Sequence, residues 1–134
     1  MSLRKLALGV MGAVVLAAAA CSSSNVLGPD NNVEVTNDPD DFAFQASALD
    51  NVSQTLSFQW TMTGTVANVD QSGSLTGGSA TLTIRDQNGV EVYSRSLAQT
   101  GTFQTTAGAE AGTWTISVNL NGASGTLNFR VQKP

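Results

Sequence analysis

Apolar and polar side chains alternate through most of this chain after its first thirty residues. In residues 55–63 an apolar side chain stands at every even position, from Leu56 to Met62, and Thr, Ser or Gln stands at every odd one. A period of two residues is typical of a β-strand with one face in a core and the other in solvent. No later stretch has apolar residues at helical spacing, so the pattern predicts an all-β domain.

Several segments share this alternation. The strongest predicted strands are Phe42–Ala48, Leu56–Met62, Ala80–Arg85, Val90–Leu97, Trp114–Leu120 and Leu127–Val131, and the shorter candidates are Val33–Thr36, Ser72–Leu75 and Thr102–Thr105. Seven or eight short strands with Gly-rich turns predict an antiparallel β-sandwich, immunoglobulin-like or jelly-roll-like. Six large aromatic side chains fall on the faces that the alternation assigns to the core: Phe42, Phe44, Phe58, Trp60, Trp114 and Phe129.

The Asn-Gly turn that follows Arg85 predicts a β-hairpin with two possible registers. A two-residue loop would pair Ile84 with Tyr93. A three-residue loop, with Gly89 as the left-handed residue of a G1 bulge, would instead set Val92 opposite Ile84. A slip of one residue turns every side chain to the other face, so burial of both valines of the second strand favours the bulged loop. In that register Tyr93 points to solvent.

The last two strands are expected to form a second hairpin. It would pair Leu120 with Leu127, Val118 with Phe129 and Ile116 with Val131 across a loop that contains Asn121, Gly122 and Gly125. This ending resembles the final hairpin of many bacterial extracellular sandwich modules.

The chain begins with a basic and then an apolar segment that ends at its only cysteine. Arg4 and Lys5 precede a 15-residue apolar run, Leu6–Ala20, and Cys21 follows directly. A basic start, a short apolar centre and small residues at the end are typical of a secretory signal peptide. The run is shorter than the roughly 20 residues that a membrane-spanning helix needs.

The segment Ala18–Cys21 resembles the lipobox of bacterial lipoproteins, with alanine where that class usually has leucine, and the resemblance covers residues 1–22. It implies a covalent lipid on Cys21 and, with Ser22 rather than aspartate next, an outer-membrane location on the periplasmic or surface face. The alternative is an ordinary A-x-A cleavage site, formed by Ala18 and Ala20, which would release a soluble secreted protein with an unpaired thiol.

The remainder of the chain is predicted to form one acidic domain on a tether. Residues 21–32 are polar and contain Gly and Pro, which predicts a flexible tether, and residues 33–134 are long enough for one sandwich with a core. Four basic and ten acidic side chains remain once the signal is removed, a formal charge of −6. We therefore do not expect nucleic acid or anionic lipid headgroups as partners.

Residues that support catalysis are scarce. The chain has no histidine, its single cysteine is assigned to lipid, and no phosphate-binding glycine motif precedes a helix. We expect no enzymatic activity and no cofactor other than the lipid on Cys21.

Three carboxylates in one turn are candidate calcium ligands. Asp38, Asp40 and Asp41 precede the strand that begins at Phe42, and carboxylate oxygens are the ligands that Ca²⁺ prefers. A solvated turn with Asp-Pro chemistry explains the same residues and is the interpretation we favour.

Two further features of the first hairpin are candidate binding groups. Tyr93, expected in solvent, is a candidate for stacking on a sugar. Arg85, Arg95 and Glu91 are expected to share the outer face of the hairpin as cross-strand ion pairs.

Together these patterns predict a lipid-anchored, non-enzymatic envelope protein whose sandwich binds another envelope protein. The alternative is a module that binds glycan or peptidoglycan. A protein partner predicts an unprotected strand edge or an apolar patch. A glycan site predicts a concave face with exposed rings and amides, drawn from Tyr93, Gln59, Gln99, Asn119 and Asn128.

Overall fold

The computed structural model describes residues 26–134, and apart from one 3₁₀ turn its regular elements are β-strands. They are η2 (Pro29–Asn31), β2 (Glu34–Asp38), β3 (Asp41–Met62), β4 (Asn68–Gln71), β5 (Ser74–Arg85), β6 (Glu91–Ser96), β7 (Gly101–Gln104) and β8 (Gly112–Gln132). All pairings between these strands are antiparallel, so the prediction of an all-β domain is confirmed. The predicted signal peptide, lipobox and Cys21 lie outside the described residues.

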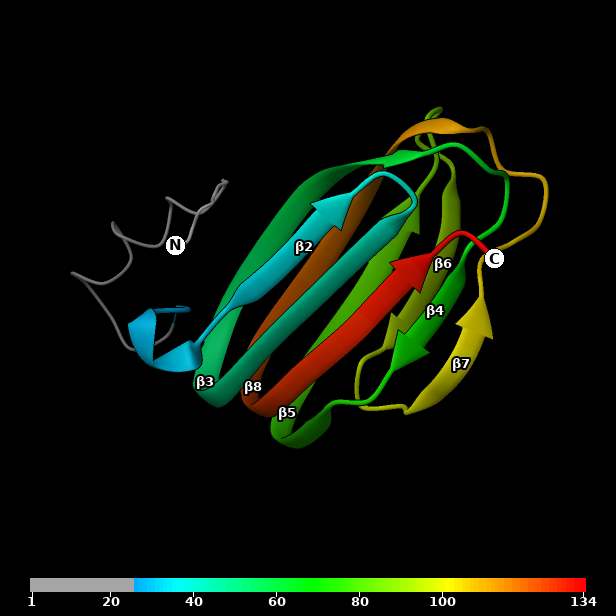
Figure 1. Cartoon of the computed structure of the whole chain (residues 1–134). Coiled ribbons are helices and arrows are strands. Elements are labelled where there is room, and N and C mark those ends of the chain that lie inside the picture. The colour runs from blue at the N-terminus through cyan, green and yellow to red at the C-terminus, as the bar shows by residue number, and fades with distance from the viewer. Residues whose placement is uncertain (1–25) are drawn as a thin grey trace.

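The fold is built around two long strands, β3 and β8, which pair with each other. They pair from Asp41 opposite Gln132 to Met62 opposite Gly112, with register shifts between Ala46 and Gln54. At these shifts the ribbon bends over on itself (Figure 1). Left-handed backbone conformations accommodate the bend, and they occur at Ala48, Asn51, Gly122 and Gly125.

The bend divides the strands into two layers. The first layer contains β2, the first half of β3, the second half of β8, β4 and β7. The second contains the second half of β3, the first half of β8, most of β5, and β6. Figure 1 shows the two layers lying one behind the other. This architecture is consistent with the predicted β-sandwich.

The core between the layers is built from the alternating apolar positions. Phe42 lies 5.2 Å from Phe58 of the other layer and 6.0 Å from Phe129, measured between ring centroids. Trp60 and Trp114 contact each other edge to face at 5.9 Å. The predicted inward orientation of these rings is confirmed, with Phe58 half-buried and the others buried.

The predicted terminal hairpin is wrong. Ile116 pairs with Phe58 and Ile84, whereas Val131 pairs with Phe42 and Val69. The chain does not reverse within one sheet at Gly122 and Gly125. It continues from one layer into the other, so the two halves of β8 belong to different layers.

The predicted position of one short strand, Ser72–Leu75, is also wrong. The predicted strand Ser72–Leu75 straddles a break, because β4 ends at Gln71 and β5 begins at Ser74. Hence β4 itself was missed.

The segment before β2 is part of the folded domain. Leu27 is fully buried, and its backbone N–H donates to Oε1 of Gln54 at 2.9 Å. The amide of Asn31 donates to the carbonyl oxygens of Ser47 and Ala48, in the bend of β3. These contacts remove residues 27–31 from the flexible tether that the sequence predicted for residues 21–32.

Candidate functional site

The turn between β2 and β3 uses Asp40 as a structural acceptor. Asp40 has a left-handed backbone (φ 65°), and its carboxylate accepts hydrogen bonds from the backbone N–H and the hydroxyl of Thr63, both at 2.7 Å. These bonds, the backbone one first, lower the pKa of Asp40 below its ordinary 3.8, and the nearby charge of Lys133 contributes in the same direction.

The other two carboxylates of the predicted calcium group have separate surroundings. Asp41 lies 3.9 Å from the guanidinium of Arg130. Asp38 contributes its backbone carbonyl, which accepts a hydrogen bond from the indole N–H of Trp60 at 2.9 Å. Residues 26–134 contain no group of three or more His, Cys, Asp or Glu side chains arranged to hold a metal ion.

Tyr93 is buried, so the prediction that it points to solvent is wrong. Its side chain is 7% exposed, and its hydroxyl donates to Oε1 of Gln71 at 2.7 Å. The amide of Gln71 in turn donates to the carbonyls of Ser96 and Gln99. Burial raises the pKa of Tyr93 above its ordinary value. A ring enclosed in this way is not presented for stacking on a sugar.

The error in the hairpin register explains the misplaced tyrosine. Ile84 lies opposite Tyr93, and the next pair is Arg85 with Glu91, so Val92 is the extra residue of a β-bulge. The bulge places two consecutive side chains, Val92 and Tyr93, on the buried side.

The bulge leaves the other valine outside. Val90, which the preferred register had buried, is 57% exposed at the tip of the loop.

Arg95 does not share the outer face with the Arg85–Glu91 pair. It stands opposite Leu82, and its guanidinium lies 3.9 Å from the ring centroid of Phe103 on β7. It also donates to Oε1 of Gln99 at 2.9 Å. Arg95 therefore fills the border between β6 and β7.

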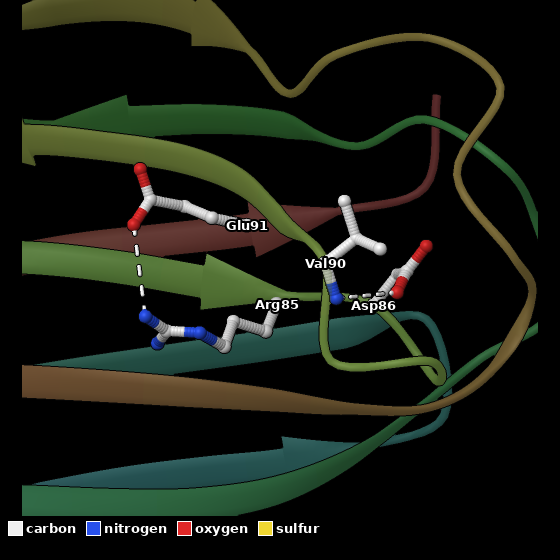
Figure 2. A network of polar contacts seen from close by, with 4 residues as sticks. All are labelled: Arg85, Asp86, Val90 and Glu91. Carbon is white, nitrogen blue, oxygen red and sulfur yellow. Dashed lines mark hydrogen bonds and ion pairs between the residues drawn. The ribbon is translucent and has the colours of Figure 1, made fainter.

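The Arg85–Glu91 ion pair forms as predicted. The two side chains approach to 3.7 Å, with about half of each exposed. Figure 2 shows this pair beside the loop that joins β5 to β6. An exposed pair of this kind contributes less than about 1 kcal/mol to stability.

Asp86 organises that loop. Its carboxylate accepts backbone hydrogen bonds from Asn88 at 2.9 Å, Val90 at 3.1 Å and Glu110 at 3.0 Å, and Figure 2 shows the contact with Val90. The bond from Glu110 is the largest cause of a lowered pKa of Asp86, and those from Val90 and Asn88 add to it. The carboxylate thus ties the β5–β6 loop to the segment before β8.

We expect Asp86→Asn to destabilise the protein at neutral pH and to have a smaller effect in acid. The pKa of Asp86 is lowered on folding, so its carboxylate stabilises the fold above its ordinary pKa of 3.8, and this contribution is lost as the pH falls through the lower folded-state value. Urea denaturation of both proteins at pH 7 and near pH 3 measures the difference. Glu91→Gln is the control, and we expect it to change stability little at either pH. A destabilisation by Asp86→Asn that is equal at both pH values would contradict this prediction.

The four amides considered for a glycan site are not brought together. Gln59 and Asn119 are exposed on the second layer, Asn128 is exposed on the first, and Gln99 lies in the loop after β6. The described residues therefore do not assemble these amides and Tyr93 on one exposed face.

The second half of β3 is an edge strand of the second layer. Residues 52–62 pair with β8 on one side, and no other strand of the described residues 26–134 pairs with them. This segment contains no charged residue, no proline and no glycine. The C-terminal end of this strand is covered by the β2–β3 turn. The backbone carbonyl of Gln59 accepts a hydrogen bond from the side-chain amide of Asn37 at 3.0 Å. The carbonyl of Thr61 accepts one from the backbone N–H of Asp40 at 2.9 Å.

Residues 53–58, which precede the covered end of this strand, are here called the open edge. In an antiparallel strand, backbone groups point to alternate sides, so Thr55 and Ser57 point outward like Gln59. Within residues 26–134 no hydrogen bond to the outward backbone groups of Thr55 or Ser57 is formed. Leu56 and Phe58 are half-buried between them. The open edge thus combines backbone groups that residues 26–134 leave unpaired with half-buried apolar side chains.

None of the helical residues between positions 26 and 134 forms a helix long and apolar enough to cross a bilayer.

Comparison with known proteins yields a distant structural similarity only. No protein-family model and no curated protein matches the chain. Among solved structures, it is similar to part of an arabinose-bound α-L-arabinofuranosidase of family GH51, with 15% sequence identity and a TM-score of 0.33. The match covers 75% of this chain and 22% of that one, so the chain spans about a fifth of the length of that enzyme.

Proposed function

We propose that this protein is a lipid-anchored, non-enzymatic component of a bacterial envelope whose β-sandwich binds another envelope protein. The observation that carries the binding role is the open edge, since an unprotected strand is a site for association with another chain. The position of Cys21, the only cysteine, directly after an apolar run supports the anchor. The buried state of Tyr93 favours a protein partner over a glycan.

The proposed anchor would hold one end of the sandwich close to the membrane. Leu27, the first buried residue of the described range, follows Cys21 by six positions. Six residues span at most about 20 Å when fully extended. Leu27 contacts Gln54, just after the bend of β3. The bend end would therefore lie near the bilayer, and the β2–β3 turn and β5–β6 loop would lie farther away.

We expect Cys21→Ser to move the protein from the membrane fraction to the soluble fraction. Acyl chains contribute about 0.8 kcal/mol per buried CH₂, and two or more chains anchor a protein stably. Fractionation of cells that produce either form, with mass spectrometry of the N-terminal peptide for the lipid, measures the effect. Ser22→Ala is the matched control and should remain in the membrane. If the Cys21→Ser protein stays in the membrane fraction, the lipid-anchor proposal is wrong.

A further inference from the structure

We infer that the open edge binds an extended segment of a partner protein, which adds to the second layer as a strand beside β3. This inference rests on the proposed binding of a protein partner and does not depend on lipidation. Strand addition takes its affinity from backbone hydrogen bonds and its specificity from alternate side chains. The open edge supplies both kinds of contact.

Within residues 26–134, the outward backbone groups of the open edge have no hydrogen-bond partner. Thr55 and Ser57 each offer one N–H and one C=O toward the outside of the layer. Native proteins normally protect such an edge with charges, proline or bulges. The neighbouring edge strand β2 has this protection, with Glu34 and Asp38 at its ends and Pro39 after it. Residues 54–62 contain no charge and no proline, and they pair with β8 without a register shift.

Apolar side chains line the inner side of the same edge. Phe58 is half-buried, with its ring 5.2 Å from Phe42 and 6.1 Å from Phe44, at the border of the aromatic cluster. Leu56 is half-buried beside it, and Val35 of β2 is 42% exposed. The apolar core is therefore accessible along this side. A partner strand with apolar side chains at alternate positions could pack those side chains against it.

The charges around the open edge indicate which charged residues the partner segment carries beside its apolar ones. The bend end carries Asp30 on η2, Glu34 at the start of β2 and Asp50 in the bend. Among the described residues, the basic side chain near this strand is Lys133. Its ammonium group donates a hydrogen bond to the hydroxyl of Thr63, which follows the covered C-terminal end of β3. An acidic surround favours a segment with Lys or Arg beside its apolar residues. It disfavours a second copy of this chain, whose own edge has the same acidic surround.

The test is site-specific photo-crosslinking of the full-length protein in native membranes. A photoreactive amino acid is placed at Thr55 or, as a control, at Thr83 in the middle of the second layer, and the crosslinked peptides are sequenced. We expect Thr55, and not Thr83, to crosslink to one extended segment with alternating apolar residues and basic flanks. A synthetic peptide of that segment should bind the purified protein, and raising the salt from 50 to 500 mM should weaken binding severalfold.

Two variants separate strand addition from other modes of contact. Ser57→Pro removes one outward N–H but none of the bonds to β8, because proline is tolerated where the N–H faces solvent. We expect it to weaken peptide binding at least tenfold, whereas Ser57→Ala should bind normally. Glu34→Lys, on an exposed position, should weaken binding severalfold whether or not the proline variant folds.

Several results would overturn the inference. They are crosslinks from Thr55 that do not exceed those from Thr83, crosslinks to a second copy of this chain, or peptide binding unchanged in Ser57→Pro and Glu34→Lys. If Cys21→Ser releases the protein from the membrane while Thr55 crosslinks to nothing, the anchor stands and the open-edge inference fails. If crosslinking succeeds but Cys21→Ser stays in the membrane, the anchor fails and the edge inference stands.

Discussion

Replacement of Trp114 with alanine is expected to lower the free energy of unfolding by about 3–5 kcal/mol, the range for truncation of a large buried aromatic side chain. Trp114 is fully buried and contacts Trp60 edge to face at 5.9 Å. Its indole N–H also donates to the carbonyl of Glu110 at 2.8 Å. Alanine would leave a cavity in the second layer and an unpaired carbonyl near the Asp86 loop. Guanidinium denaturation of residues 22–134 measures the change.

Trp114→Phe separates the volume of the ring from its hydrogen bond. Phenylalanine retains much of the bulk and loses the N–H, so we expect a smaller cost than that of alanine. Thr115→Ala, next in the chain and on the opposite face, controls for a change in the same strand and should alter stability by less than about 1 kcal/mol. A cost below about 1 kcal/mol for Trp114→Ala would mean that the two tryptophans are not packed as the structure shows.

The inward or outward orientation of most strand residues was predictable, because it depends on local alternation alone. In residues 55–63, for example, the even side chains face the core and the odd ones face solvent, as the period of two indicates. The prediction lost accuracy at bulges. Alternation along the predicted strand Phe42–Ala48 puts Ala48 on the same inner face as Phe42, but Ala48 is exposed, because the register shifts that follow Ala46 turn Leu49 inward instead.

Strand pairing was less predictable, because it depends on contacts between distant residues. The sequence shows Ile116 and Val131 as apolar residues on either side of a Gly-rich loop, which is the pattern of a hairpin. A hairpin and a strand that bends between two layers both need glycine near position 122. What separates them is the presence of β3 along the full length of β8, and no local signal indicates it.

The candidate site shows the same division. The absence of charge, proline and glycine from residues 52–62 is visible in the sequence, but the chain alone does not show that this strand lies at an edge. The predicted position of Tyr93 is wrong because strict alternation sets neighbouring side chains on opposite faces, whereas the bulge turns both Val92 and Tyr93 inward. The carboxylate of Asp86 accepts a hydrogen bond from the N–H of Val90, which lies in the loop before β6 and is exposed.

Gly78→Ala is expected to destabilise the protein by about 2–5 kcal/mol, because two costs act at one position. Gly78 has a left-handed backbone (φ +67°), which costs roughly 1–2 kcal/mol for a residue with a Cβ. A Cβ there would also collide with the carbonyl oxygen of Gly122, where β5 passes the bend of β8. Overpacking of this kind costs about 1–3 kcal/mol. Chemical denaturation of the variant tests the sum.

Two other glycines separate these costs. Gly89→Ala introduces the left-handed strain alone, since φ is +80° and no atom lies within 4 Å of the added Cβ, so it should cost about 1–2 kcal/mol. Gly77→Ala introduces neither, because its nearest contact is Ser124 Cβ at 3.8 Å, and we expect a change below about 1 kcal/mol. If Gly78→Ala cost no more than Gly89→Ala, β5 and β8 would not approach closely at the bend. In that case the close contact of Gly78 with Gly122 would not be what holds β5 against the bend that folds β3 and β8 into two layers.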